Sequence, residues 1–171
     1  MEFKNKKMFK RYISFVISFL VIIESLCVFN FASASTSVNT LAVKEIVSKD
    51  GASFALMEDD TVKTWGFNHY GQLGIGNTTN QYSPVTIPNL SGVEQIVANS
   101  GSTLAVMSDG TVKTWGYNDY GQLSIANTTN QYSPVTIPGL SGVEQLVSGD
   151  YCASAVLSDG TVKAWGRNYY G

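Results

Sequence analysis

Hydrophobic and polar residues recur with a period of 50 residues along most of this chain. Residues 61–110 and 111–160 are identical at 36 of 50 positions, and a third copy begins at Thr161. The pattern also extends upstream, because residues 43–56 align with residues 93–106. Self-similarity at a fixed long period indicates a repeat architecture.

Each period contains four short stretches rich in β-branched, aromatic or small apolar residues. In the middle copy these are residues 93–98, 102–108, 111–117 and 132–138. No stretch of ten residues shows the periodicity of an amphipathic helix. The pattern therefore predicts four β-strands per repeat.

The turn between the second and third strands contains Asp109-Gly110, and Asp159-Gly160 repeats it. An Asp-Gly pair between two strands is a strong signal for a hairpin with a type I′ turn. The first copy has Asp59-Asp60, so Asp60 must either adopt a strained left-handed conformation or form another turn.

Paired prolines mark the fourth strand. Pro84 and Pro88 lie four residues apart, so the missing N–H donors fall on the same edge of the strand. A strand edge without donors should face no partner. Residues 83–88 are therefore predicted to form the outermost strand of the sheet.

A tryptophan followed by glycine recurs at positions 65, 115 and 165, and the glycine is predicted to permit a close approach of the next backbone that a bulky residue would block. A buried tryptophan removes about 150–250 Å² from water, so these three residues are predicted to form the core of the stacked repeats. Four antiparallel strands with an exposed last strand describe a blade of a β-propeller. The predicted fold is all-β: an incomplete, open arc of about two and a half four-stranded blades.

The N-terminal segment has a different composition. Residues 1–11 hold five cations, an apolar run spans residues 13–23, and Ala32-Ser33-Ala34 follows. This pattern is typical of a Sec signal peptide cleaved after Ala34. The alternative is a retained membrane anchor, in which Glu24 and Asn30 would be costly in hydrocarbon.

These boundaries divide the chain into a signal peptide, a lead-in and the repeats. The predicted segments are residues 1–34 (signal peptide), 35–42 (polar lead-in), 43–60 (partial repeat), 61–110, 111–160 and 161–171 (truncated repeat).

Charge argues against a nucleic-acid partner. The chain has 11 basic and 13 acidic residues, and residues 1–34 contain five and two of these. The remainder has 6 basic and 11 acidic residues, a net charge of −5, and its cations are dispersed. Nucleic-acid binding requires a positive stripe. A membrane contact is expected only through an uncleaved leader.

Candidate catalytic chemistry is sparse. His69 is the only histidine, and no metal-ligand spacing, calcium loop or phosphate cradle occurs. The sequence predicts no enzyme, cofactor or metal site. Cys152 is the only cysteine left after cleavage, which excludes an internal disulfide. It is predicted to pack as a small hydrophobic residue, with a reactive thiol as the alternative.

The repeated motif Trp-Gly-x-Asn-x-Tyr-Gly-Gln-Leu, with Ser-Pro-Val and Leu-Ser-Gly-Val, resembles the repeat of the regulator of chromosome condensation family. The resemblance covers about residues 43–171 and implies a propeller, usually seven-bladed, that acts as a protein-binding platform. Secreted bacterial members include an inhibitor of β-lactamases. The nuclear namesake is a nucleotide-exchange factor, but a secreted acidic chain would meet no small GTPase.

Two departures from the family pattern affect the expectations. The histidine that the family usually carries in the second strand is Ala52, Ser102 or Cys152 here. Gly74 becomes Ser124 in the next copy, which predicts a less tight turn. Because closed propellers have four to eight blades, we expect the N-terminal part of a longer protein, a truncated product, or a chain that assembles with others.

Candidate binding residues come from the positions that change among the three copies of the Trp-Gly motif. Framework positions must satisfy packing, whereas changing positions often map to a binding face. Tyrosine and arginine are also enriched at interface hot spots. The predicted rim contains Phe67, His69, Tyr117, Asp119, Arg167 and Tyr169, although neutral drift would give the same variation.

The sequence therefore predicts a secreted or cell-surface protein-interaction module without catalytic activity. The alternative is a carbohydrate-binding module, which should expose Tyr70, Tyr120 and Tyr170 on one rim. A truncated remnant without function remains the third interpretation.

The signal-peptide prediction is tested by N-terminal sequencing of the exported protein. We expect a chain that begins at Ser35. A membrane-bound form that retains Met1 would contradict cleavage.

Overall fold

A computed structural model describes residues 42–169. The predicted signal peptide, the lead-in up to residue 41 and the last two residues lie outside this range. The described residues contain no helix with the length and hydropathy of a membrane span.

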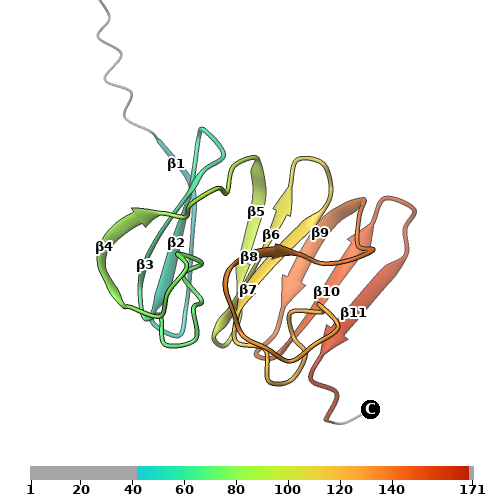
Figure 1. The fold of residues 1–171 in the computed structure, drawn as a ribbon. Coiled ribbons are helices and arrows are strands. Elements are labelled where there is room, and N and C mark those ends of the chain that lie inside the picture. Colours follow the sequence, from blue (N-terminus) through green and yellow to red (C-terminus); the bar gives the residue numbers. More distant parts are fainter. Residues whose placement is uncertain (1–41, 170–171) are drawn as a thin grey trace, which may run out of the picture. The chain divides into compact units, whose positions relative to one another are not determined.

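All regular structure in residues 42–169 is β-strand, arranged in three antiparallel sheets (Figure 1). We call these sheets blades 1 to 3. Blade 1 contains β1 (Val43–Lys49), β2 (Ala52–Met57), β3 (Val62–Gly66) and β4 (Gln81–Thr86). Blade 2 contains β5 (Val93–Ala98), β6 (Ser102–Met107), β7 (Val112–Gly116) and β8 (Gln131–Thr136). Blade 3 contains β9 (Val143–Ser148), β10 (Cys152–Leu157) and β11 (Val162–Gly166).

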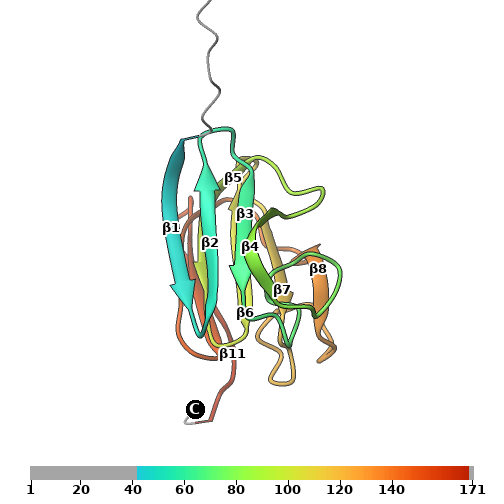
Figure 2. The same ribbon diagram turned by 90° about the vertical axis from the view of Figure 1, so that its left-hand side faces the viewer.

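Strands within each sheet follow chain order, as Figure 2 shows for β1 to β4. The blades form an open arc, as the repeat pattern predicted. The expected strand at residues 93–98 has the predicted bounds, and the other three in that repeat differ by at most two residues at either end.

The outermost position of the fourth strand is confirmed, although β4 spans Gln81–Thr86 instead of residues 83–88, so Pro88 lies outside it. In blade 1, β4 pairs only with β3, and the N–H of Ile87 donates to the carbonyl of Val62 at 2.9 Å. Pro84 therefore lies in a strand whose other edge has no partner in the sheet. The missing proline donor breaks no ladder hydrogen bond there.

The predicted type I′ turn is wrong. Gly110 has positive φ, but Asp109 does not, as a type I′ turn would require. The N–H of Gly110 donates to the carbonyl of Met107, which gives a three-residue loop closed by a left-handed glycine. The Asp109 carboxylate holds this loop by accepting the N–H and hydroxyl of Thr111 at 2.9 and 2.6 Å.

The first copy forms its hairpin with Asp60 in the left-handed conformation, at φ 60°. Asp59 accepts the N–H and hydroxyl of Thr61 there, as its counterpart does in blade 2. The first of the two expected alternatives is therefore correct, and the short polar side chain of Asp60 tolerates this conformation.

Burial follows from the stacking of the blades. All six residues of β6 are buried, because blade 2 has a neighbour on each side. In β10 burial alternates, because blade 3 has a described neighbour on one side only. One hydrophobic cluster fills the space between blades 1 and 2, and a second lies between blades 2 and 3.

The three repeated tryptophans differ in burial. Trp115 is fully buried, with 0% of its surface exposed, as predicted. Trp65 and Trp165 are only half-buried. The repeat places each tryptophan against the preceding blade, and no described blade precedes Trp65.

The glycine after each tryptophan is required by a close backbone approach. A Cβ at Gly116 would lie 2.4 Å from the carbonyl oxygen of Gly101, and one at Gly66 would lie 2.1 Å from that of Gly51. Both glycines also have φ near 100°, which other residues rarely adopt. The sequence prediction for this position is confirmed.

The two ends of the arc expose apolar side chains. Val43 and Ile46 are exposed on blade 1, and Val162 is exposed on blade 3. Cys152 is also exposed, so its predicted packing as a buried residue is wrong. Its counterpart Ser102 is buried in blade 2, which has a described blade on each side.

Replacement of Trp115 tests the stacked core. We expect Trp115→Ala to lower the free energy of unfolding by about 3–5 kcal/mol, as for large truncations in cores. Urea denaturation of the full chain measures this loss. Trp65→Ala is the matched control and should cost less, because Trp65 is half-buried. A loss for Trp115→Ala below about 1 kcal/mol, the range of surface substitutions, would contradict the packing.

Candidate functional site

A buried asparagine shapes the long loop that follows β3. The side-chain amide of Asn68 donates to the carbonyls of Asn77 and Thr79 at 2.9 and 3.0 Å, and its oxygen accepts the N–H of Leu73 at 3.0 Å. Asn118 makes the same contacts in the loop after β7. Because these hydrogen bonds lie inside each loop, both loops adopt one shape and present their side chains at equivalent places.

A backbone carbonyl joins the loop of blade 1 to blade 2. The carbonyl of Gln72 accepts the indole N–H of Trp115 at 2.8 Å and the hydroxyl of Thr103 at 3.0 Å. The side-chain oxygen of Gln72 accepts the N–H of Tyr70 at 3.0 Å. The tryptophan of one blade thus fixes the position of a tyrosine from the preceding blade.

We call the contact between blades 1 and 2 the first junction and the contact between blades 2 and 3 the second junction. The second junction repeats the bond between a tryptophan indole and a glutamine carbonyl. The indole of Trp165 donates to the carbonyl of Gln122 at 3.1 Å. Ser124 adopts φ 53° and donates its N–H to Gly121 at 3.0 Å, while Gly74 makes the equivalent bond at 2.9 Å. The expectation of a less tight turn at Ser124 is therefore wrong.

The loops bring aromatic rings from the blades into one continuous series, which we call the rim ladder. In blade 1, Phe67 stacks on His69 with ring centroids 5.6 Å apart, and both contact Tyr70 edge-on. Tyr70 contacts Tyr117 of blade 2 at 4.7 Å, and Tyr117 contacts Tyr120 at 5.9 Å.

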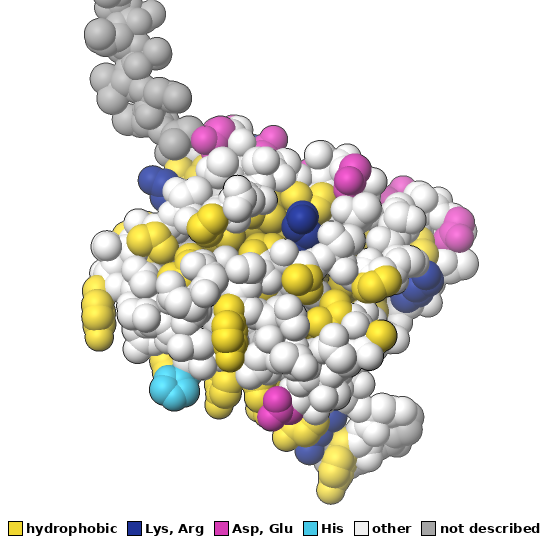
Figure 3. All heavy atoms as spheres, viewed as in Figure 1, with side chains coloured by type: hydrophobic (Ala, Val, Ile, Leu, Met, Phe, Trp, Pro, Cys, Tyr) yellow, Lys and Arg dark blue, Asp and Glu magenta, His cyan; other side chains and the backbone are white. Residues whose placement is uncertain are grey.

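The ladder continues into blade 3. Tyr151 contacts Tyr120 at 5.2 Å and Tyr117 at 6.4 Å. The guanidinium carbon of Arg167 lies 4.7 Å from the ring centroid of Tyr120 and 5.0 Å from that of Tyr169. Figure 3 shows hydrophobic side chains at the lower edge of the molecule, beside the histidine and charged side chains.

Much of the ladder is accessible. The exposed fraction is 38% for Phe67, 39% for Tyr70, 44% for Tyr120 and 70% for Tyr169. Tyr117 is half-buried at the centre of the series. Surface aromatic side chains in mutual contact are typical of interaction sites.

The six residues chosen from the sequence all lie in the ladder or contact it. Asp119, the only one without a ring or guanidinium, accepts a hydrogen bond from the Tyr117 hydroxyl. Their role in binding stays a prediction.

Three members of the ladder were missed as part of the rim set: Tyr70, Tyr120 and Tyr151. The first two are repeated in the copies, and the sequence predicts them only as part of a glycan-binding face. The third replaces Gly51 and Gly101 of the other copies. Comparison of copies at the turn before β10 would have identified Tyr151.

Tyr117 has a perturbed hydroxyl. Partial burial and the hydrogen bond to the Asp119 carboxylate raise the pKa of Tyr117 to about 12. Both causes favour the neutral phenol, because a phenolate would be desolvated and close to another negative charge. The Tyr117 hydroxyl thus remains a hydrogen-bond donor well into the alkaline range.

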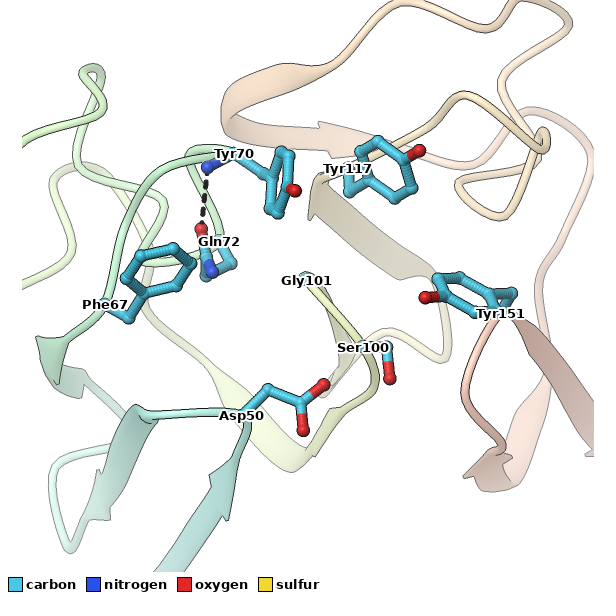
Figure 4. Close-up of a pocket in the computed structure, with 8 residues that line it drawn as sticks. All are labelled: Asp50, Phe67, Tyr70, Gln72, Ser100, Gly101, Tyr117 and Tyr151. Atoms are coloured by element: carbon cyan, nitrogen blue, oxygen red, sulfur yellow. Dashed lines mark hydrogen bonds between the residues drawn. The ribbon is translucent and has the colours of Figure 1, made fainter.

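A pocket of about 150 Å³ opens between the loops at the blade 1 end of the ladder. Figure 4 shows its aromatic walls and the carboxylate of Asp50 on the opposite side. The lining residues are Asp50, Phe67, Tyr70, Gln72, Ser100, Gly101, Tyr117 and Tyr151. In the part of the chain that the structure describes, no group of three or more His, Cys, Asp or Glu residues is placed to hold a metal ion.

Comparison with protein families gives a direct match. The model of the regulator of chromosome condensation (RCC1) repeat matches residues 59–106 and 109–156, and a second model of this repeat matches residues 43–72 and 93–122. The chain belongs to the RCC1 repeat family. The resemblance expected from the Trp-Gly motif is therefore confirmed.

Solved structures show the same fold. Human WBSCR16 is 27% identical, with a TM-score of 0.68 over 74% of this chain. Yeast RCC1 (Prp20), solved with Kap60, is 22% identical, with a TM-score of 0.66 over 72% of this chain. Prp20p from Saccharomyces cerevisiae, in a study of its binding to Gsp1p and histones, is 22% identical with a TM-score of 0.64 over 72% of this chain.

The chain matches 33%, 32% and 33% of the lengths of these proteins, about a third. The RCC1 propeller fold suggests a protein-interaction module.

Proposed function

We propose that this chain is a secreted or cell-surface, non-catalytic protein-interaction module that binds its partner through the rim ladder. The observation that carries the proposal is the continuity of the ladder across all three blades, with ring contacts from Phe67 to Tyr120 and the Arg167 guanidinium between Tyr120 and Tyr169. The proposed export rests on the leader pattern of residues 1–34.

The chemistry of the ladder favours a protein partner. Tyrosine, phenylalanine and arginine are enriched at protein interfaces, and tyrosine and arginine are frequent at hot spots. Rings held by their neighbours lose little conformational freedom when a partner binds, so less of the interaction energy is lost to ordering. The indole bond of Trp115 to Gln72 supplies this preorganisation at the first junction.

Relatives support the use of this fold in protein binding. The yeast RCC1 structure contains bound Kap60, and the study of Prp20p concerns its binding to Gsp1p and histones. The identity of those partners does not carry over to this chain, which covers only about a third of each relative and is 22% identical to both.

One observation favours a second candidate, the glycan-binding module. Tyr70 and Tyr120 are exposed on the same rim, as that interpretation requires, and Tyr170 lies outside the described residues. However, sugar stacking needs an open ring face. Arg167 already lies over the ring of Tyr120. We therefore rank protein binding above glycan binding.

Site-specific photo-crosslinking in the full chain tests the proposal. Phe67→p-benzoylphenylalanine places the crosslinker at an exposed position of the ladder. We expect a discrete protein adduct when the labelled chain is added to cells of its source. Arg167→Ala in the same chain should weaken the adduct roughly tenfold, the effect of losing a hot-spot residue, without changing the circular dichroism spectrum.

Tyr82→p-benzoylphenylalanine is the control, because Tyr82 is 98% exposed and has no ring contact within the described residues. It should give no adduct. Identical adducts from both positions, or none from Phe67, would contradict binding at the ladder. Retention on cell-wall polysaccharide that Tyr120→Ala abolishes, without a protein adduct, would favour the glycan candidate.

A further inference from the structure

The pocket at the first blade junction combines ring walls with a carboxylate. Phe67, Tyr70, Tyr117 and Tyr151 supply the rings, and Asp50 faces them across the opening (Figure 4). Aromatic rings attract cations through their negative faces, and a neighbouring carboxylate adds to this attraction. The volume of about 150 Å³ suits the end of one side chain rather than a larger ligand.

The pocket is open because Gly101 has no side chain. A Cβ at Gly101 would lie 3.1 Å from Cδ2 of Tyr70 and 3.2 Å from Cβ of Tyr117. At the second junction, the equivalent position is occupied by Tyr151, whose ring contacts Tyr120. Two junctions with the same framework thus differ in one respect: the first is open and the second is filled.

The second junction also shows that a guanidinium group can pack against the rings at this position. Arg167 lies there with its guanidinium carbon 4.7 Å from the ring centroid of Tyr120 and 5.7 Å from that of Tyr151. The equivalent of Tyr120 at the first junction is Tyr70, and the equivalent of Arg167 is Tyr117. The first junction therefore has the rings but no guanidinium of its own.

Charge at the pocket is unbalanced. Lys49, the residue before Asp50, pairs with Asp150 at 3.0 Å. Asp50 makes no hydrogen bond or ion pair within residues 42–169, although the Lys49 ammonium is close enough to interact with its carboxylate electrostatically. The chain after residue 34 has a net charge of −5, which favours a basic group on the partner.

We infer that the pocket between blades 1 and 2 binds an arginine side chain of a protein partner. The guanidinium stacks against the pocket rings and donates hydrogen bonds to the Asp50 carboxylate. This inference rests on the proposed protein-binding function and identifies the chemistry of the residue that anchors the partner.

Arginine fits better than lysine or a sugar. Its planar guanidinium stacks on rings while its N–H groups donate in the plane, which an ammonium cannot do. Gln72 turns its amide oxygen to the N–H of Tyr70, so its amide nitrogen faces the pocket (Figure 4). The second junction shows the same combination, since Nε2 of Gln122 has no hydrogen-bond partner there and Arg167 lies over the ring of Tyr120.

Peptide titration of the full chain tests the inference by NMR. The probes are the capped tripeptide Gly-Arg-Gly and its citrulline analogue, which has nearly the same shape but no charge. We expect the arginine peptide to shift the ring signals of Phe67 and Tyr70. The citrulline peptide should bind at least about tenfold more weakly, because it lacks the charge for cation–π contact and ion pairing.

Two variants separate the contributions. Asp50→Asn should weaken arginine binding about fivefold, the upper range for a partly exposed ion pair. It should leave the turn intact, because asparagine tolerates the φ of 48° at this position. Phe67→Leu removes one ring and should also weaken binding. The matched controls Glu94→Gln and Tyr82→Leu, both outside the pocket lining, should have no effect.

Equal binding of both peptides, or undiminished binding to Asp50→Asn, would overturn the arginine pocket. Shifts of the pocket rings by methyl glucoside, without shifts by the arginine peptide, would overturn it in favour of a sugar. These outcomes are distinct from failure of the proposed function: a chain that forms the Phe67 adduct but does not prefer arginine remains a protein-interaction module.

Discussion

The hydrogen bond from the Trp115 indole to the Gln72 carbonyl is the contact on which the rim depends. It buries the polar atom of the largest core side chain against the preceding blade, at 2.8 Å. A buried indole N–H without a partner would be costly, so the bond fixes one relative position of the two blades. Gly74 permits the approach, since a Cβ there would lie 2.8 Å from the indole nitrogen. The positions of the rim side chains therefore depend on the packing of Trp115 in the core.

Because the indole–carbonyl contact is repeated between successive blades, residues that vary among the copies come together at the rim surface. The Asn68 and Asn118 networks give both long loops the same shape, and the indole bonds of Trp115 and Trp165 join successive blades. Residues at equivalent positions therefore meet at each junction, but their identities differ. At the first junction this gives an open pocket, and at the second it gives an arginine packed between tyrosines.

The sequence was sufficient to predict the fold because each blade is specified by local signals. Pro84 identified the edge strand, and the glycine after Trp115 identified a close backbone approach. The prediction of a type I′ turn was wrong because an Asp-Gly pair fits both a two-residue loop and the end of a three-residue loop. The Asp109 contact with Thr111, which holds the longer loop, involves a residue beyond the pair. The predicted burial of Cys152 was wrong because burial at this position requires a neighbouring blade, and the local sequence pattern does not show whether one is present.

The candidate site was only partly predictable. Variation among the copies identified six residues, but it assigned Tyr70 and Tyr120 to the framework because they do not vary. The structure shows that a repeated residue can pack on the framework and still be exposed at the rim. The pocket could not be predicted, because it depends on the distance between Gly101 and rings from three blades.

The most direct test of this account is the nuclear Overhauser contact between the rings of Tyr70 and Tyr117, measured before and after Trp115→Phe. Phenylalanine keeps the apolar ring but removes the indole donor. The account predicts a contact in the unchanged chain, where the centroids are 4.7 Å apart, and its loss or marked weakening in the variant. Absence of the contact in the unchanged chain, or full retention in the variant, would contradict the claim that the indole bond positions the rim.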